Sequence, residues 1–454
     1  MSFLGIAIAI LVLLGAGGMI FKKYKAQAVF LGAGLIMIIA AHLLGITPIL
    51  SEEKSTGFWL IDAFDVIRSS LSSTASGLGM IIMSVGGYAT YMDHIGAGEA
   101  MVKICINPLK KLGSPYIVLA LAYTVGQILN IFIPSAAGLA ILLMATIYPV
   151  LVSLGVSPIA AVSVITTTAC LDLGPASGAS NIASETAGIS AMNYFVKYQM
   201  MVAIPVIIVI TIAHYFIQKY ADKKMNFISV EKVMEEKRKE KAPAVYAVLP
   251  LIPLLLLLVF NEFVISTISI DVITAMLIGL FVSILFEIAV KRNVREVFKG
   301  MQSYFDGMGK QFATVITLIV AAGLFAKGLQ SIGLIDAIIN HAQNLGFGAA
   351  PMTVIMVAII SATAFVTGSG NAAFVSFAAL APVISESFHV DVVVLLMAMQ
   401  LAAGIARSFS PVASCVIAPS AYADVPALDV ARRNLIPMIA GIVVLVIADF
   451  VLFL

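Results

Sequence analysis

Short polar breaks inside long apolar regions hold the residues of this chain that are best suited to chemistry. Two of them, at 134–138 and 367–371, are rich in Ser and Gly and interrupt otherwise apolar sequence. A second break follows each of these along the chain, at 173–181 and 407–414. An interrupted helix leaves backbone N–H groups unpaired and carries a partial positive charge at its N-terminus. The breaks therefore predict a site for an anion, or for Na⁺ where carbonyl and hydroxyl oxygens gather.

The breaks of the two halves are spaced alike, which indicates one unit used twice. Pro149 and Pro382 end the apolar arms that follow the first break of each half, and they are 233 positions apart. Pro175 and Pro411 lie in the second breaks and are 236 positions apart. Irregular backbone at membrane depth is tolerated only where protein buries it or where it lines a wet cavity. Broken segments at corresponding places in two halves predict the substrate site of a transporter.

The side chains at the breaks supply hydroxyl, amide and guanidinium groups that hydrogen-bond to an anion. The candidate substrate-binding residues are Ser135, Gly138, Ser177, Asn181, Thr367, Gly368, Ser369, Gly370, Asn371, Arg407, Ser408, Ser410 and Ser414. For any single serine, close packing of helices against a small residue is the favoured explanation. The recurrence of the pattern at four breaks favours a binding site over packing alone.

Charged residues are rare in the apolar regions, so each one suggests a function. Two roles are open for Arg407: a two-pronged clamp on a substrate carboxylate, or a structural pair with Asp172 or Glu185. Asp172 lies at the matching place in the first half, where it neutralises Arg407, binds a cation or carries a coupling proton. The candidate residues for a coupling ion, Na⁺ or H⁺, are Asp172, Gly174, Asn181 and Asn371.

The composition indicates a polytopic all-α membrane protein. Of 454 residues, 61% are hydrophobic and 11% are charged, and the mean hydropathy is +1.08. Soluble domains carry about 25% charged residues. Many apolar runs reach the roughly 20 residues that span a bilayer, and the alternating pattern of an outer-membrane barrel is absent. The net charge of +2 and the lack of a basic stripe argue against binding to nucleic acid.

The sequence offers no set of residues for enzymatic catalysis. It has no Walker A loop, no His/Cys metal set and no convincing pair of nucleophile and base. Cys105, Cys170 and Cys415 have no paired or metal-like spacing and are interpreted as small buried residues. No cofactor is expected beyond a possible coupling ion.

The elements that must position these breaks form two repeats. The first repeat covers 1–219, with a re-entrant hairpin at 115–154 and a broken helix at 157–189. A charged linker at 220–243 follows. The second repeat covers 244–454, with a hairpin at 349–387 and a broken helix at 390–424. Two full spans joined by a small polar loop are the alternative to each hairpin.

The prediction for the whole chain is about ten transmembrane helices, five in each half. The third and eighth spans are expected at 76–92 and 311–329, after a polar connection at 51–73 and a basic interfacial stretch at 291–310. Lys and Arg accumulate in alternate connections, which places those connections and the 220–243 linker in the cytoplasm and both termini outside. An odd number of spans per half makes the two repeats inverted.

Several motifs identify a resemblance to a known family. They are Ser135-Ala136-Ala137-Gly138-Leu139 with Leu143-Met144-Ala145-Thr146, Ala321-Ala322-Gly323-Leu324-Phe325-Ala326-Lys327-Gly328-Leu329, Thr367-Gly368-Ser369-Gly370-Asn371-Ala372 and Arg407-Ser408-Phe409-Ser410-Pro411-Val412. These runs resemble the DcuC family of anaerobic C4-dicarboxylate carriers, within the ion-transporter superfamily. The likeness extends over nearly the whole chain, and the motifs of the second half are the most specific.

The resemblance implies uptake, exchange or efflux of succinate, fumarate, malate or aspartate-like anions in the bacterial inner membrane. It also implies a homodimer, with a transport region that moves like an elevator against a scaffold region. In the superfamily, hairpin tips and broken helices hold the carboxylates and any coupling Na⁺. This marks Ser135, Thr367, Ser369 and Asn371 at the tips, and Ser177, Asn181, Ser408, Ser410 and Ser414 at the breaks.

One departure from the superfamily lies at the first tip. The sequence there is Ser-Ala-Ala at 135–137, whereas the dicarboxylate/Na⁺ branch has Ser-Asn-Thr, which argues against Na⁺ coupling through that tip. Two other functions remain open from the sequence. One is the same fold carrying another organic anion or an amino acid, and the other is an anion channel.

Overall fold

The structure is a computed structural model of the chain. It describes residues 3–453 apart from 23, 110–111, 113, 226–242, 261–263, 266, 269 and 345–347. The linker expected at 220–243 therefore lies largely outside the described residues. Every regular element in the described part of the chain is a helix.

The helices of the first half carry the first tip, at 134–138, and the break at 173–181, which is called the first break from here on. The second tip, at 367–371, and the second break, at 407–414, lie in the second half. The helices of the first half are α1 (Phe3–Phe21), α2 (Ala26–Leu43), η1 (Glu52–Lys54), α3 (Trp59–Thr74), η2 (Ala75–Gly79), α4 (Met80–His94), α5 (Ala97–Ile106), α6 (Pro115–Phe132), α7 (Ala136–Thr146), α8 (Tyr148–Ser153), α9 (Pro158–Thr167), α10 (Gly178–Thr186), α11 (Ala191–Asn193), η4 (Tyr194–Gln199) and α12 (Met200–Lys224).

The helices of the second half follow in a similar order. They are η5 (Ala244–Leu251), α13 (Ile252–Val259), α14 (Val272–Lys291), α15 (Val294–Gly300), α16 (Gln302–Gln311), η6 (Phe312–Ile316), α17 (Thr317–Ser331), α18 (Leu334–Asn344), α19 (Ala349–Thr367), α20 (Gly370–Ala378), α21 (Ala381–Phe388), α22 (Val392–Arg407), α23 (Ser414–Tyr422) and α24 (Ala427–Phe453).

Helix length and composition support an integral membrane protein. Among the described residues, seven helices are long and apolar enough to cross a bilayer. The number is eight if α20 and α21, which are bent by 55° at their junction, count as one span. This is fewer than the ten spans expected from the sequence. The difference arises because several expected spans are short in the structure, such as the 16-residue α22, or are divided, such as η5 and α13.

The helical path is interrupted at all four polar breaks. α6 ends before Ser135 and α7 begins after it, while α19 and α20 are separated by Gly368 and Ser369. The longer gaps, between α9 and α10 and between α22 and α23, are the first break and the second break. Corresponding helices begin at similar intervals, since α20 starts 234 positions after α7 and α17 starts 237 positions after α4. The spacing seen in the sequence thus extends to the helix bounds.

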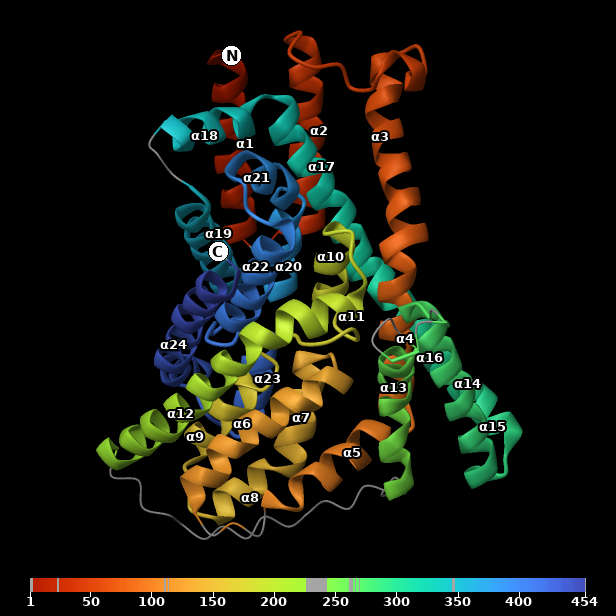
Figure 1. The fold of residues 1–454 in the computed structure, drawn as a ribbon, viewed down its shortest axis with the longest axis vertical. Coiled ribbons are helices and arrows are strands. Elements are labelled where there is room, and N and C mark those ends of the chain that lie inside the picture. The colour runs from red at the N-terminus through yellow and green to blue at the C-terminus, as the bar shows by residue number, and fades with distance from the viewer. Residues whose placement is uncertain are drawn as a thin grey trace.

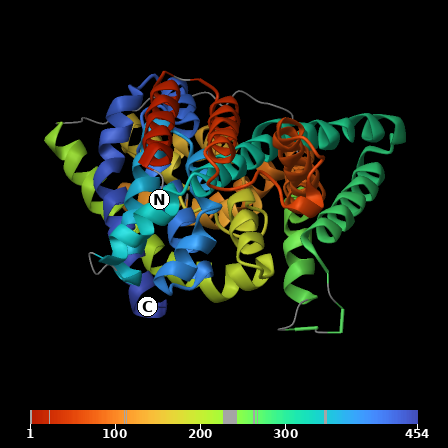
Figure 2. The same ribbon diagram turned by 90° about the horizontal axis from the view of Figure 1, so that it is seen from above.

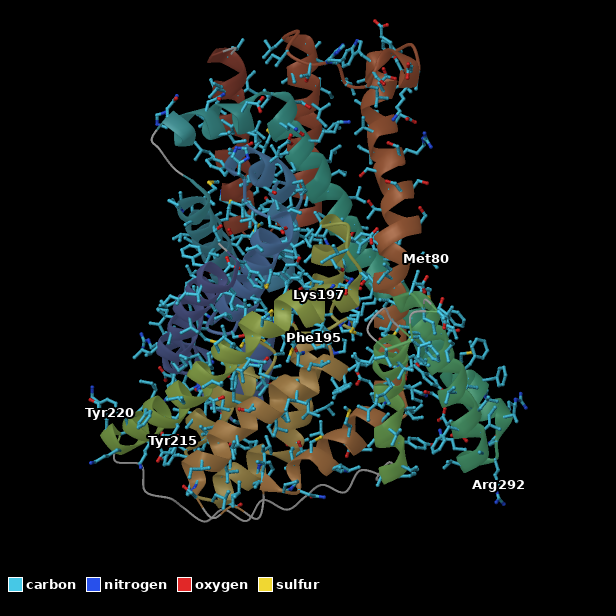
Figure 3. All side chains as sticks on the ribbon, in the orientation of Figure 1. Met80, Phe195, Lys197, Tyr215, Tyr220 and Arg292 are labelled. Carbon is cyan, nitrogen blue, oxygen red and sulfur yellow. The ribbon has the colours of Figure 1, made fainter. Side chains whose placement is uncertain are left out.

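Helices occupy much of two segments that the sequence analysis treats as connections between spans. The segment at 51–73 is not a polar connection throughout, because α3 is a helix that continues through the π-helical turn η2 into α4. Figure 3 shows Met80 at the point where η2 passes into α4. The basic stretch at 291–310 likewise contains α16, which continues through the π-helical turn η6 into α17. Charged residues in these segments, such as Asp62 and Asp65 in α3, interrupt the apolar sequence and made the helices look like connections.

A polar loop is fastened to the beginning of α3. The carboxylate of Asp62 accepts hydrogen bonds from Thr56 Oγ1 at 2.6 Å, Ser55 Oγ at 2.7 Å and Thr56 N at 2.6 Å. The Thr56 and Ser55 hydrogen bonds hold the pKa of the Asp62 carboxyl below its usual range. They fix the chain at the point where the long helix begins.

The broken segments lie between the two ends of the molecule. Figure 1 shows α5 to α9 at one end and α18 and α21, beside α1 and α2, at the other, with α10, α20, α22 and α23 between them. Helices from opposite halves pack together there: α7 lies against α23, and α10 lies against α20 and α22. Figure 2 shows α13 to α16 and α3 projecting to one side of this body. The four broken segments thus meet at the middle of the molecule.

A buried acid ties four helices together at one end of the body. Asp222 of α12 is 3% exposed and accepts a hydrogen bond from Arg433 of α24 at 2.6 Å. It also accepts hydrogen bonds from Ser157 Oγ, at the start of α9, at 2.6 Å and from Tyr116 of α6 at 3.0 Å. A buried carboxylate requires such partners. This Asp222 cluster holds α6, α9, α12 and α24 as one unit.

Candidate substrate site

The second tip and the two broken helices are in backbone contact. A methyl group added to Gly404 of α22 would lie 2.3 Å from the carbonyl oxygen of Cys170, in the first break. One added to Gly370, at the start of α20, would lie 2.9 Å from the carbonyl oxygen of Ala403. Atoms do not approach so closely without a shift of the backbone. The glycines therefore allow the second tip, the second broken helix and the first break to stack on one another.

Polar side chains of the first break form hydrogen bonds with the backbone of the same segment. Asn181 donates to the carbonyl oxygens of Pro175 and Ser177, each at 2.8 Å. The Ser177 hydroxyl caps α10 by accepting from the Ser180 amide at 3.4 Å. Asp172 has φ of +47° and Gly174 has φ of +88°, so the chain turns sharply between them. Ser177 and Asn181 thus shape the break, and the amide group of Asn181 is already engaged.

The second tip presents a capped helix start and a free amide side chain. Ser369 caps α20 by accepting from the Ala372 amide at 3.2 Å, and its own amide donates to Thr367 Oγ1 at 3.3 Å. Gly368 has φ of +69° and packs against the backbone at Val412. Asn371 is exposed in the first turn of α20. Among the described residues it makes no side-chain hydrogen bond, so it is available to a ligand.

The second break is fixed to its neighbours through serine. Ser410 Oγ donates to the Phe365 carbonyl at 2.5 Å, and Ser408 Oγ donates to the Gly404 carbonyl at 3.0 Å. Asn434 of α24 donates to the Ser408 carbonyl at 3.0 Å. Ser414, the first residue of α23, is exposed. Of the serines in this break, Ser414 is therefore the one best placed to meet a ligand.

Arg407 and Asp172 form a buried ion pair. Arg407 NH1 lies 3.2 Å from Asp172 Oδ2, and NH2 lies 3.3 Å from Oδ1. Arg407 NH2 also donates to the Ala169 carbonyl at 2.8 Å. The two residues are 9% and 6% exposed, respectively. Of the roles that the sequence left open for Arg407, the geometry shows the pair with Asp172, and in this conformation the guanidinium is not free for a substrate.

Two glutamines and a tyrosine that the sequence analysis did not single out hold the broken helices in place. Gln400 of α22 donates to the carbonyl oxygens of Leu171 at 3.1 Å and Asp172 at 3.2 Å. Its carbonyl oxygen accepts from Tyr194 at 2.8 Å and from Gln199 at 2.9 Å. The sequence signal for such residues is an uncharged polar side chain within an apolar helix. Burying such a side chain without a hydrogen-bond partner is costly, so its presence indicates a contact with another polar group.

The first tip lies close to η5, α13 and α14. Ser135 is exposed and caps α7 by accepting from the Gly138 amide at 3.1 Å. The neighbouring Pro134 lines a narrow cavity of about 20 Å³ with Pro175 of the first break and residues of η5, α13 and α14. The first tip and the first break thus face the same helices.

A larger open cavity lies at the far end of α10. It has a volume of about 380 Å³ and is lined by Asn181, Ser184 and Glu185, with Leu257 and Phe260 opposite. Glu185 therefore lies at this cavity and does not pair with Arg407. Among the described residues, no group of three or more His, Cys, Asp and Glu side chains could hold a metal ion. Neutral oxygens, which Na⁺ also accepts, are present at the breaks.

A comparison with protein families finds one family model that matches almost the entire chain. The family model described as "DcuC: C4-dicarboxylate anaerobic carrier" matches residues 4–454. The chain belongs to the DcuC family. DcuC proteins are transporters and not enzymes, as the sequence analysis predicted.

Curated DcuC relatives match the chain over its full length. The "Probable anaerobic C4-dicarboxylate transporter DcuC" of Vibrio cholerae is 36% identical over 452 residues, covering 99% of this chain and 98% of the relative. The "Anaerobic C4-dicarboxylate transporter DcuC" of Escherichia coli K12 is 33% identical over 448 residues, covering 99% and 96%.

Two solved transporter structures share the fold of this DcuC protein. The Alcanivorax borkumensis YdaH transporter has a TM-score of 0.60 at 12% identity, covering 93% of this chain and 98% of that one. Neisseria gonorrhoeae MtrF has a TM-score of 0.61 at 13% identity, covering 94% of each chain. At these identities the likeness concerns the fold alone.

Proposed function

We propose that this protein is a secondary transporter of C4-dicarboxylates, such as succinate, fumarate, malate or aspartate, in a bacterial inner membrane. The full-length match to DcuC relatives is the observation that carries the proposal. The stacked helix breaks support it, because each supplies a helix N-terminus that binds anions.

In this proposal the substrate carboxylates bind at helix starts. The N-termini of α20 and α23 supply unpaired backbone N–H groups, and Asn371 and Ser414 add exposed donors beside them. Ser135 plays the equivalent part at the start of α7. The Arg407–Asp172 pair contributes no net charge, so the positive ends of the helices balance the anion.

The proposal includes a moving transport region and a fixed scaffold. The recurring helix bounds of the two halves support two repeats, which the proposal takes to be inverted. Movement of the hairpins and broken helices against the remaining helices, in a homodimer with its termini outside, completes the proposed mechanism. Coupling is to Na⁺ or H⁺, because an uncompensated charge is costly to carry through hydrocarbon.

The test is uptake of radiolabelled succinate into proteoliposomes, with Na⁺ and pH gradients imposed separately. Asn371→Ala is expected to lower uptake at subsaturating succinate by about tenfold or more, because a hydrogen bond to a charged group contributes about 1.5–3 kcal/mol. Ser369→Ala is expected to lower it as well, since it removes the cap of α20. Ser303→Ala in α16, whose hydroxyl donates to the nearby Gly300 carbonyl at the end of α15, is the matched control.

Three outcomes contradict the proposal in different ways. Absence of succinate uptake and of exchange against preloaded succinate would mean another organic anion or an amino acid as cargo. Flux that neither saturates nor shows stimulation by substrate on the opposite side would indicate an anion channel. Saturable uptake that is unaffected in Asn371→Ala and Ser369→Ala would place the site away from the second tip.

A further inference from the structure

A carboxyl group in α24 is fully buried and has no partner. Asp449 is 0% exposed. Neither of its carboxylate oxygens has a hydrogen-bond partner in the described part of the chain, and no ion pair there includes it. The other buried acids among the described residues all have partners: Asp172 and Asp222 each pair with an arginine, Glu287 pairs with Lys291, and Asp62 accepts hydrogen bonds from Ser55 and Thr56. Asp449 is therefore in a different electrostatic state.

The sequence of α24 directs this carboxyl into the protein. Asn434, Met438, Gly441 and Leu445 recur at intervals of three or four residues and are buried, and Asp449 continues the same stripe. The stripe packs against α12 and α22, and Gly441 lies against Ile210 of α12. The carboxyl group thus points to the helices that carry the candidate site and away from lipid.

No positive charge in the described part of the chain forms an ion pair with Asp449. On α22 the charged residue is Arg407, which is paired with Asp172, and Asp391 caps the other end of that helix. α9 has no ionisable side chain, and α23 contributes Cys415 and Tyr422. α12 carries the buried His214, whose Nε2 lies 3.0 Å from Thr167 Oγ1, and then, between 215 and 224, Tyr and Lys residues and Asp222, which pairs with Arg433. The segment that leads into α12, where Figure 3 labels Lys197, adds Tyr194, Lys197 and Tyr198. Of these, Tyr194 interacts electrostatically with Asp449.

An ionised carboxylate in this position is unfavourable, whereas a protonated one is not. Removing an unpaired charge from water costs several kcal/mol or more, and a carboxyl avoids the cost by binding a proton. A metal ion would require several more oxygen ligands, but the nearby Tyr194 hydroxyl already donates to Gln400 at 2.8 Å. A proton needs no further ligand.

We propose that Asp449 is the binding site of a coupling proton, occupied in the conformation described here and emptied when water reaches it in another. This inference rests on the proposed transport function and specifies its coupling ion. The route to the candidate site is short: Tyr194 bonds to Gln400, and Gln400 bonds to the Asp172 and Leu171 carbonyls of the first break. A negative charge on Asp449 acts first on Tyr194, the residue that anchors Gln400.

The experiment compares wild-type protein with Asp449→Asn in succinate-loaded proteoliposomes that contain a pH-sensitive dye. Asparagine has the shape of a protonated aspartate but cannot release a proton. We expect Asp449→Asn to keep succinate/succinate exchange within about twofold of wild type. We expect it to lose at least tenfold in uptake driven by a pH gradient, together with the substrate-dependent change in internal pH. Asp429→Asn, an exposed acid in the first turn of the same helix, is the control.

The results of this experiment test the role of Asp449 separately from the proposed transport function. Proton movement by Asp449→Asn equal to that of wild type would overturn the proposal, as would a folded variant that loses exchange together with coupling. Asp449→Glu keeps a titratable group and is expected to keep coupling with a shifted pH profile; an unchanged profile would count against the proposal. If wild-type protein itself fails to exchange succinate, then the proposed function fails and not the role of Asp449.

Discussion

At the scale of single residues, the contact between Arg407 and Asp172 shows what one sequence can and cannot reveal. Both residues were identified because charge is rare in apolar helices. Their contact joins positions 235 apart and depends on how two broken helices cross, which no local pattern specifies. The sequence also indicated both Asn371 and Asn181 as candidates, but the engagement of Asn181 with the carbonyls of Pro175 and Ser177 depends on the irregular backbone of the break.

Removing one member of this pair is expected to destabilise the protein strongly. Arg407→Gln leaves Asp172 buried and unpaired, and breaking a buried pair costs about 3–5 kcal/mol. A large fall in the thermal unfolding temperature of the detergent-purified variant is expected. Asp172→Asn combined with Arg407→Gln removes both charges and is expected to recover part of the loss.

The double variant also gives the result that would contradict this prediction. If the two single effects simply add, then the residues are not coupled and the contact does not matter for stability. Lys103 and Glu99 offer a comparison, because both side chains of this ion pair, at 2.6 Å, are partly exposed. Removing that pair is expected to cost about 1 kcal/mol or less.

At the scale of helices, the sequence predicted the breaks well and the connections poorly. Gly, Ser and Pro clusters inside apolar sequence mark a place where a helix cannot continue, so 134–138 and 367–371 were evident. α3 was not predicted as a helix because Asp62, Asp65, Arg68 and several serines interrupt its apolar sequence. The crossing of α22 with the first break was not predictable, because it depends on one glycine.

That glycine provides a test of the crossing. Gly404→Ala would place a methyl group against the Cys170 carbonyl and is expected to destabilise the protein by about 1–3 kcal/mol. Gly32→Ala in α2, where nothing lies within 4 Å of the added group, is the control. It is expected to be neutral or slightly stabilising, because alanine favours a helix by about 1 kcal/mol over glycine. Equal thermal stability of the two variants would refute the crossing.

At the scale of the molecule, the proposed movement requires the second hairpin to change its position relative to α17. Lys327 of α17 and Leu380, which joins α20 to α21, line one open cavity of about 310 Å³. Joining cysteines at these two positions with a short bifunctional thiol reagent is expected to abolish succinate transport. The measurement is uptake before and after cross-linking, and recovery after reductive cleavage of the link.

The control for this cross-link joins two helices that are expected to stay together. Phe30 of α2 and Phe325 of α17 have ring centroids 5.0 Å apart. Cysteines linked at these positions should leave transport unchanged in a background without Cys105, Cys170 and Cys415. Full transport by the cross-linked Lys327→Cys/Leu380→Cys protein would show that α17 and the hairpin do not move apart.

The Asp222 cluster bears on how the chain is assembled during its synthesis. Three of its members, Tyr116, Ser157 and Asp222, enter the membrane with the first half, whereas Arg433 follows 211 residues after Asp222. Until the ribosome has delivered α24, the first half therefore holds an acid whose cationic partner Arg433 has not yet been made. Nascent chains that stop before α24 should remain open to the insertion machinery and to quality-control proteases. Arrival of α24 is thus the event that completes the body.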